Sequence, residues 1–316
     1  MSTGRVIHTG QAVVDLVLRV PAVPAAGGDV FASGHEFLAG GGVNVMLAAA
    51  RDGARVVYAG GHGTGPFGDV VRAALAAEDV ELTGPADPGI DTGFSVALVD
   101  DDAERTFVST AGAEGAVDVA RLRGTDPGEG DVVYASGYSL VHDANRAALL
   151  EWLPTVPAGC TVVVDPAPVI GDVDLDAVRV LLDRADVWTT NEQEALILLR
   201  RLGSEADGAD AATALATATG RTVVLRAGSR GALLARPGQD VVNCPAPEVE
   251  AVDTNGAGDA HAGVMCARLA AGEDLPAAVR RASVAAAIAV TRSGPATAPT
   301  TAEIDTALRD GTTRRS

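Results

Sequence analysis

Short β-branched segments alternate with Ala- and Leu-rich segments of helical length, and this alternation constrains the fold more than any other feature of the chain. The segments that we expect to form strands are residues 55–59, 131–136, 161–165, 185–189 and 221–226. The segments that we expect to form helices are residues 44–52, 69–78, 143–153, 175–184, 193–202, 209–219, 259–271 and 275–291. Alternation at this spacing predicts an α/β fold with a doubly wound, mostly parallel sheet flanked by helices. Such a sheet binds its ligands at the carboxyl ends of its strands.

Two segments, residues 11–37 and 92–109, do not follow this alternation, because they carry strand-like residues without a crossover helix. Phe94 and Val96 begin an alternation that runs to an Asp-rich turn, after which residues 106–108 return, and this is the pattern of a hairpin. We therefore predict that the two segments form a small antiparallel β-sheet that projects from the core as a lid. A simple extension at the edge of the main sheet would fit these residues equally well.

The core would then comprise residues 1–10, 38–91 and 110–316. An apolar content of 47% over 316 residues is ample for a buried interior. The formal net charge of −18 argues against a protein that binds nucleic acid or an anionic membrane surface, since both need clustered positive charge. Any phosphate group must therefore be held by local features of the fold.

The cysteines and the apolar segments bear on the cellular compartment of the protein. Cys160, Cys244 and Cys266 show no C-x-x-C spacing, so they predict neither a zinc site nor a disulfide framework. The first residues lack the apolar core of a signal peptide, and no uncharged apolar run is long enough to span a membrane. We expect a protein of the reduced cytoplasm.

The chain contains no lysine, so all 24 basic residues are arginine. This absence excludes a P-loop, the strand lysine of protein kinases and the Schiff-base lysine of pyridoxal enzymes. A phosphate site that uses backbone N–H groups and a metal ion remains possible.

Residues 63–68 form a Gly-x-Gly-x-x-Gly pattern after a predicted strand, which is a formal match to a dinucleotide site. However, Pro66 removes a backbone donor where a pyrophosphate would need one, and the strand is not the first of the chain. We interpret these glycines as turn or packing residues.

Residues 253–262 read Asp-Thr-Asn-Gly-Ala-Gly-Asp-Ala-His-Ala and stand directly before a nearly uncharged helix. Free N–H groups at a helix start carry the positive end of the helix dipole, and small residues let a phosphate come close to them. Asp259 would lie in the first turn of this helix, facing the phosphate. The sequence therefore predicts an anion pocket with a base beside it, although an Asp that only caps the helix would give part of this pattern. His261 fits a position on the helix surface as well as a substrate contact.

This segment resembles the second signature, Asp-Thr-x-Gly-Ala-Gly-Asp, of the ribokinase-like (PfkB) carbohydrate kinases. The resemblance implies that Asp259 is the general base that takes the proton of the substrate hydroxyl. It also implies that the backbone of Gly256, Ala257 and Gly258 stabilises the transferring phosphoryl group. Family members often use a monovalent cation such as K⁺ near the residues that match Asp253 and Asn255, and the Asn in place of the common Thr leaves this cation open.

Further matches to the family lie on the substrate side of the proposed site. Asp15 stands in an otherwise apolar strand, where its charge needs a partner, and the resemblance implies that it binds sugar hydroxyls. Gly40, Gly41 and Asn44 resemble the first signature, Gly-Gly-x-x-x-Asn, either with Ala39 in place of its first Gly or with a loop that is one residue shorter. Asn44 could also be a plain N-cap, and Asp15 could stand at an exposed position.

The lid residue Arg105 could lie over the substrate, although an exposed arginine is common on a hairpin. Asn191 and Glu194 match the family's Asn-x-x-Glu element, which implies that Glu194 organises Mg²⁺ through water; a capping box gives the same pattern.

The remaining matches concern the nucleotide. Residues 228–231, with Gly228, Ser229 and Gly231, resemble the nucleotide loop, which a plain turn would also explain. Ser283 falls on the helix that lines the adenine pocket in the family.

The resemblance implies a ribokinase-like fold and an ATP-dependent kinase of a sugar hydroxyl that uses ATP and Mg²⁺. Its lid would cover the sugar and often serves for homodimer contacts. The acceptor would be a small-molecule sugar; a nucleoside kinase of the same superfamily is the alternative, and a non-catalytic sugar-binding regulator is a third. An aromatic content of 3% favours a sugar over a base that needs a stacking platform.

Overall fold

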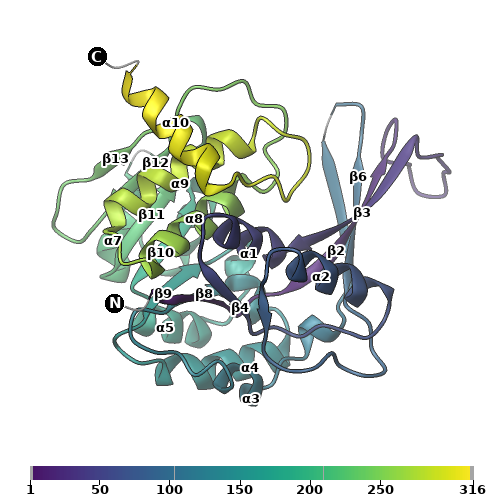
Figure 1. The fold of residues 1–316 in the computed structure, drawn as a ribbon, viewed down its shortest axis with the longest axis horizontal. Helices are drawn as coiled ribbons and strands as arrows, with labels where there is room; N and C mark the ends of the chain where they lie inside the picture. Colours follow the sequence, from purple (N-terminus) through teal and green to yellow (C-terminus); the bar gives the residue numbers. More distant parts are fainter. Residues whose placement is uncertain (1–2, 103, 209, 314–316) are drawn as a thin grey trace.

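The computed structural model describes residues 3–102, 104–208 and 210–313. In these ranges a nine-stranded sheet forms the centre of the molecule (Figure 1). From one edge to the other its strands are β13 (Val242–Cys244), β12 (Ala232–Ala235), β11 (Thr222–Arg226), β10 (Val187–Asn191), β9 (Thr161–Asp165), β8 (Val132–Ser136), β1 (Arg5–His8), β4 (Arg55–Tyr58) and β5 (Glu81–Leu82). The pairs from β11 to β5 are parallel, and β12 and β13 add an antiparallel edge. The predicted doubly wound, mostly parallel sheet is confirmed.

Helices cover both faces of this sheet (Figure 1). They are α1 (Gly42–Arg51), α2 (Pro66–Ala76), α3 (Val119–Arg123), α4 (Asp143–Trp152), α5 (Leu175–Arg184), α6 (Glu192–Arg201), α7 (Ala211–Thr219), α8 (Ala257–Ala270), α9 (Leu275–Ala289) and α10 (Thr301–Thr313). Successive strand residues pack into opposite cores: Val6 and Val132 join the core with α1, α8 and α9, whereas Ile7 and Val133 join the core with α4 to α7. This is why the strands are continuous apolar runs. None of the helices in the described ranges combines the length and apolarity that crossing a bilayer requires.

A separate four-stranded sheet projects from the core (Figure 1). Its order is β3 (Gly34–Gly41), β2 (Ala12–Arg19), β6 (Phe94–Val99) and β7 (Arg105–Ser109). The hairpin of β6 and β7 is confirmed, and the structure favours the lid over an extension of the main sheet. The expectation of a wholly antiparallel sheet is wrong, because β2 and β6 pair in parallel. Between β2 and β6 the chain forms α1, β4, α2 and β5 of the core. It therefore enters the lid again at β6 in the same direction as at β2.

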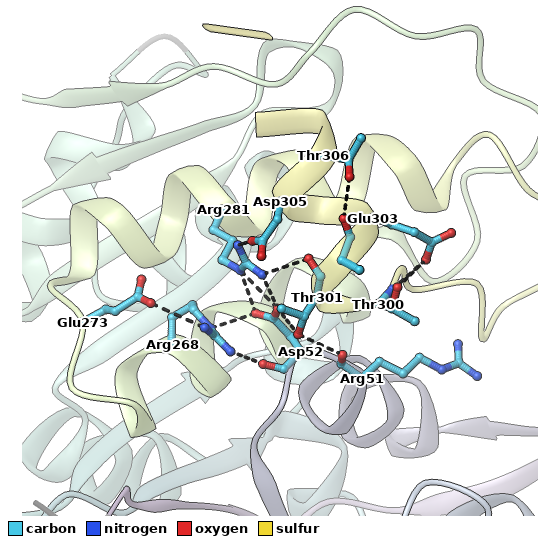
Figure 2. A network of polar contacts seen from close by, with 11 residues as sticks. Arg51, Asp52, Arg268, Glu273, Arg281, Thr300, Thr301, Glu303, Asp305 and Thr306 are labelled. Atoms are coloured by element: carbon cyan, nitrogen blue, oxygen red, sulfur yellow. Dashed lines mark hydrogen bonds and ion pairs between the residues drawn. The ribbon is translucent and has the colours of Figure 1, made fainter. Parts of the chain in front are cut away.

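A buried ionic network joins four helices that lie on the same face of the sheet (Figure 2). Asp52, at the end of α1, is fully buried. Its carboxylate accepts hydrogen bonds from Arg281 of α9 at 2.7 Å and pairs with Arg268 of α8 at 2.9 Å. The hydroxyl of Thr301, at the start of α10, donates to the same carboxylate at 3.2 Å. The network therefore fixes the carboxyl-terminal ends of α1 and α8 against each other.

We predict that Asp52→Asn lowers the free energy of unfolding by about 3–5 kcal/mol, because Arg281 and Arg268 lose their shared buried counter-charge and keep only the more exposed partners Asp305 and Glu273. Urea unfolding monitored by circular dichroism measures this loss. Glu273→Gln is the control, since Glu273 is an exposed partner of Arg268, and it should cost less than about 1 kcal/mol. Equal, small losses in both variants would contradict this account of the network.

Candidate active site

A cavity of about 770 Å³ lies between the lid and the carboxyl ends of the parallel strands. Strand ends contribute Asp165 from β9 and Arg226 from β11, and the lid contributes Asp15 from β2. Helix starts contribute Asn44 from α1 and Asp259 from α8. The cavity thus lies where a doubly wound sheet places its ligands, and it gathers residues that are far apart in the sequence.

Asp259 lies in the first turn of α8, which begins directly after Gly256. Gly256 has φ 74°, and a Cβ there would lie 2.0 Å from the carbonyl oxygen of Pro295, so the turn requires glycine. A Cβ at Gly258 would approach Arg226 at 3.5 Å, which puts this guanidinium beside the start of the helix. The N–H groups of the first turn, the dipole and Arg226 together favour an anion here.

The surroundings of Asp259 raise its pKa to about 6. Burial is the largest cause, and the negative charge of Asp165 adds to it. A hydrogen bond from Asn44 Nδ2 to Asp259 Oδ2 at 3.0 Å and the charge of Arg226 act in the opposite direction. Asp259 is therefore ionised at neutral pH yet able to take a proton, which suits a general base.

Asp15 faces the same cavity from the lid. Burial, and secondly the charge of Asp259, raise the pKa of Asp15 to about 6. A Cβ at Gly40 would lie 2.1 Å from Asp15 Oδ2, so the paired strand makes room for the carboxylate only with glycine. Across the lid sheet, Ser95 and Ser109 line the cavity as well and are hydrogen-bonded to each other at 2.9 Å. This wall offers a carboxylate and two hydroxyls, as a polyol ligand requires.

Arg226, Asp165 and Glu194 form an ionic cluster in the cavity wall. Arg226 donates to Asp165 Oδ2 at 3.0 Å and pairs with Glu194 Oε2 at 3.3 Å. The two carboxylates, against the effect of burial, raise the pKa of Arg226 above its ordinary value. Arg226 thus remains a fixed positive charge beside the start of α8.

Asn191 and Glu194 also form the capping box that the sequence allowed. Asn191 Oδ1 accepts from the backbone N–H of Glu194 at 2.8 Å, and Glu194 Oε2 accepts from the backbone N–H of Asn191 at 2.8 Å. Capping does not remove Glu194 from the site, because its side chain lines the cavity. Burial raises the pKa of Glu194, and Asp165 adds to the effect.

Arg105 crosses from the lid to the loop before α8. Its Nη2 lies 2.7 Å from Asp253 Oδ1, and Asp253 also accepts from the N–H groups of Asn255 at 2.9 Å and Gly294 at 3.1 Å. Burial works to raise the pKa of Asp253, but these hydrogen bonds lower it below its ordinary value. Arg105, Asp253 and Asn255 line a second cavity of about 260 Å³ that meets the larger one at Asp15.

The predicted nucleotide residues lie further out. Gly228 and Ser229 belong to an exposed turn between β11 and β12, outside the lining of the 770 Å³ cavity. A Cβ at Gly231 would lie 2.2 Å from the carbonyl oxygen of Cys244, so packing against β13 already requires this glycine. Ser283 is buried, and its hydroxyl donates to the carbonyl oxygens of Cys244 and Val279.

Two other sequence features have structural explanations. The N–H groups of Phe67 and Gly68, at the start of α2, donate to the carboxylate of Asp91 at 3.0 and 2.8 Å. The Gly-x-Gly-x-x-Gly segment therefore already holds an internal anion, and the packing interpretation fits. His261 is 3% exposed and burial lowers its pKa to about 3, so the suggested position on the helix surface is wrong.

Comparison with known proteins gives a consistent result. A model of the pfkB family of carbohydrate kinases matches residues 4–302. The chain belongs to this family. It is therefore a carbohydrate kinase, a phosphotransferase that uses an alcohol group as acceptor.

Individual relatives align with nearly the whole length of this chain. The uncharacterised sugar kinase YegV of Escherichia coli is 31% identical over 95% of this chain and 92% of its own length. An ATP-dependent ribose-1-phosphate kinase of Halopiger xanaduensis is 30% identical over 94% of this chain and 95% of its own length. A ribokinase structure from Thermotoga maritima has a TM-score of 0.81 at 23% identity and covers 98% of this chain and 100% of that one. The expected ribokinase-like fold is confirmed.

Sequence reasoning missed several residues of the cavity. Asp165 and Arg226 end two predicted strands, and the rule that ligands bind at strand ends could have pointed to them. His8 and Gln11 also line the cavity. His8 ends β1, a strand that was not predicted, so its position gave no signal.

We predict that Asp259→Asn stabilises the protein by about 3 kcal/mol at pH 7.5. The folded pKa of about 6 lies above the ordinary aspartate value of 3.8, so the folded state binds the proton more tightly than the unfolded state. The protonated Asp259 makes its full contribution to the free energy of unfolding below about pH 4, and this contribution is lost as the pH rises through about 6. Asparagine does not ionise, so the variant keeps its stability at high pH. Urea unfolding at pH 7.5 and pH 5 measures it.

Asp253→Asn is the contrasting control. Because the pKa of Asp253 is lowered, its stabilisation is present above its unfolded pKa, and the variant should be destabilised at pH 7.5. An Asp259→Asn protein less stable than the wild type at pH 7.5 would count against a buried, unfavourably placed charge.

Proposed function

We propose that this kinase phosphorylates a hydroxyl of a free sugar, with Asp259 as the general base. The observation that carries the proposal is a carboxylate with a pKa of about 6 at the start of α8, in a cavity that it shares with Asp15. Asp15 and Asn44 would hold the acceptor. Gly40 and Gly41 would let it approach the backbone.

The chemistry follows from these positions. Asp259 accepts the proton of the acceptor hydroxyl, and the hydroxyl oxygen forms a bond to the γ-phosphorus of ATP. The bond between that phosphorus and the bridging oxygen breaks, and ADP leaves. The N–H groups of Gly256, Ala257 and Gly258 would stabilise the charge on the phosphoryl oxygens. Arg226 adds a fixed positive charge beside them.

The residues present fit Mg²⁺. Asp165 and Glu194 line the cavity near Arg226, and the described residues donate no hydrogen bond to Glu194 Oε1. Magnesium usually keeps several waters and takes phosphate oxygens as ligands, so Glu194 would hold it through water. When bound, the ion would neutralise charge on the transferring phosphoryl group. We propose that Asn191 supports Glu194, and that Gly228, Ser229, Gly231 and Ser283 lie along the ATP.

Asp253 and Asn255 fit K⁺ less well than Asp165 and Glu194 fit Mg²⁺. The Arg105 guanidinium already lies against the Asp253 carboxylate, and two N–H groups occupy its remaining directions. We propose that Arg105 supplies the positive charge at this loop and that a monovalent cation is not required.

A nucleoside is the second candidate acceptor. Phe107 and Tyr138 line the cavity, and their rings are about half exposed, so either could stack on a base. Phe107, which lies on the lid, was not recognised from the sequence as a residue on which a base could stack. A non-catalytic regulator is disfavoured because the base and the anion pocket are both present.

The lid also bears on assembly and location. One row across the four lid strands consists of Phe37, Leu16, Val96 and Val108, and its two end residues, Phe37 and Val108, are exposed. We propose a homodimer through this face, which sedimentation equilibrium checks and a monomer at micromolar concentration would contradict. Use of ATP and three free, buried cysteines fit the cytoplasm.

A screen of ATP consumption tests the function. The panel comprises free pentoses and hexoses, nucleosides and ribose 1-phosphate, each with Mg²⁺ at pH 7.5. We expect turnover with a free sugar and a loss of at least about 10³-fold in Asp259→Asn, with ATP binding retained in a calorimetric titration. An Asp259→Asn enzyme that keeps its activity would refute the assignment of the base, and turnover with nucleosides alone would select the second candidate.

A cation series tests the role of Arg105. We expect the wild type to turn over equally, within about twofold, in K⁺, Na⁺ or tetramethylammonium buffers, because its positive charge is covalently attached. Arg105→Met should lose activity and regain part of it in K⁺. Arg19→Met, on the same face of the lid and 53% exposed, is the control. Strong activation of the wild type by K⁺ would show that Arg105 does not serve this role.

A further inference from the structure

Three polar side-chain atoms in the wall of the large cavity have no hydrogen-bond partner among the described residues. They are His8 Nε2, Gln11 Nε2 and Asn44 Oδ1, and each is buried. Buried polar atoms are nearly always paired in proteins, because an unpaired one costs about 1–3 kcal/mol. Three such atoms around one cavity indicate that a polar ligand completes them.

His8 is a fixed hydrogen-bond donor. The backbone N–H of Gly10 donates to His8 Nδ1 at 3.1 Å, so Nδ1 carries the lone pair and the proton of the neutral ring lies on Nε2. Burial lowers the pKa of His8 to about 3, which keeps the ring neutral. The ring stacks on Tyr134 with centroids 5.0 Å apart, and a Cβ at Gly42 would lie 2.3 Å from its Cε1. The imidazole is therefore held in place, and only glycine fits at position 42 against its Cε1–Nε2 edge.

Gln11 and Asn44 are oriented by the start of α1. The carbonyl oxygen of Gln11 accepts from the N–H of Gly42 at 2.7 Å, which fixes this residue beside the helix. Its Nε2 adds a second donor to the wall. Asn44 Nδ2 donates to Asp259, so Oδ1 is left as an acceptor. The wall thus presents two donors and one acceptor close to the carboxylate of the proposed base.

We propose that His8 and Gln11 determine sugar specificity by donating hydrogen bonds, directly or through one ordered water, to oxygens of the acceptor next to the reacting hydroxyl. Asn44 Oδ1 accepts a hydrogen bond from one of these hydroxyls. The proposal rests on the proposed function and defines its substrate class: a sugar with adjacent oxygens that can accept from both donors. A deoxy sugar that lacks one of these oxygens leaves a buried donor unpaired and is rejected.

Kinetics of His8→Leu and Gln11→Leu test the proposal. The probes are the sugar that gives the highest turnover in the panel above and each of its monodeoxy derivatives. Each variant should lose about tenfold in kcat/KM for the full sugar, which is the effect of about one hydrogen bond, while the KM for ATP stays unchanged. The deoxy derivative that the wild type rejects should be used equally well by the wild type and by the matching variant.

Two further variants separate specificity from folding. His62→Leu is the matched control, because His62 is also buried with an unpaired Nε2 but does not line the cavity. Gln11→Met keeps the length of the side chain and carries the test if His8→Leu does not fold. His8→Asn keeps an N–H donor and should recover part of the loss.

The outcomes are distinct. Full activity and unchanged discrimination in His8→Leu and Gln11→Leu would overturn this inference and leave the proposed function standing. Equal losses for the full sugar and for every deoxy derivative would assign both residues a structural role and overturn it as well. If the wild type phosphorylates no sugar in the panel, the proposed function fails, and the inference fails with it.

Discussion

The hydrogen bond between Asn44 and Asp259 is the interaction on which the rest of the site depends, because it joins the starts of α1 and α8. These two helices run side by side. A Cβ at Gly263 would lie 2.3 Å from the carbonyl oxygen of Val45, so the backbones approach closely at mid-length. At the far ends Asp52 of α1 pairs with Arg268 of α8. A helix pair fixed at both ends holds the proposed base without help from a loop.

The same arrangement solves an electrostatic problem. A chain with a formal charge of −18 repels ATP at long range, so attraction must come from charges at the site itself. The start of α8 and Arg226 supply it on the phosphate side, and Arg226 is itself held by Asp165 and Glu194. On the acceptor side, the pKa values of Asp15 and Asp259 are both raised to about 6, chiefly by burial.

Much of this could be predicted from the sequence, and the exceptions have physical causes. The bounds of β9 and α5 agree with prediction to the residue, because both elements have clear apolar patterns and abrupt ends. The two-residue strand β5 carries too short a pattern to be recognised. Roles that depend on distant partners were also missed: no local pattern links Arg105 to Asp253, and the importance of Arg226 arises only when β11 lies beside α8.

The most direct test of the central claim is a crystal structure with ADP, aluminium fluoride and the accepted sugar. The account predicts that the fluoride group contacts the N–H groups of residues 256–258 and the guanidinium of Arg226. It also predicts that the acceptor oxygen lies within hydrogen-bond distance of the Asp259 carboxylate. A phosphoryl mimic bound elsewhere, or an acceptor oxygen directed away from Asp259, would contradict the account.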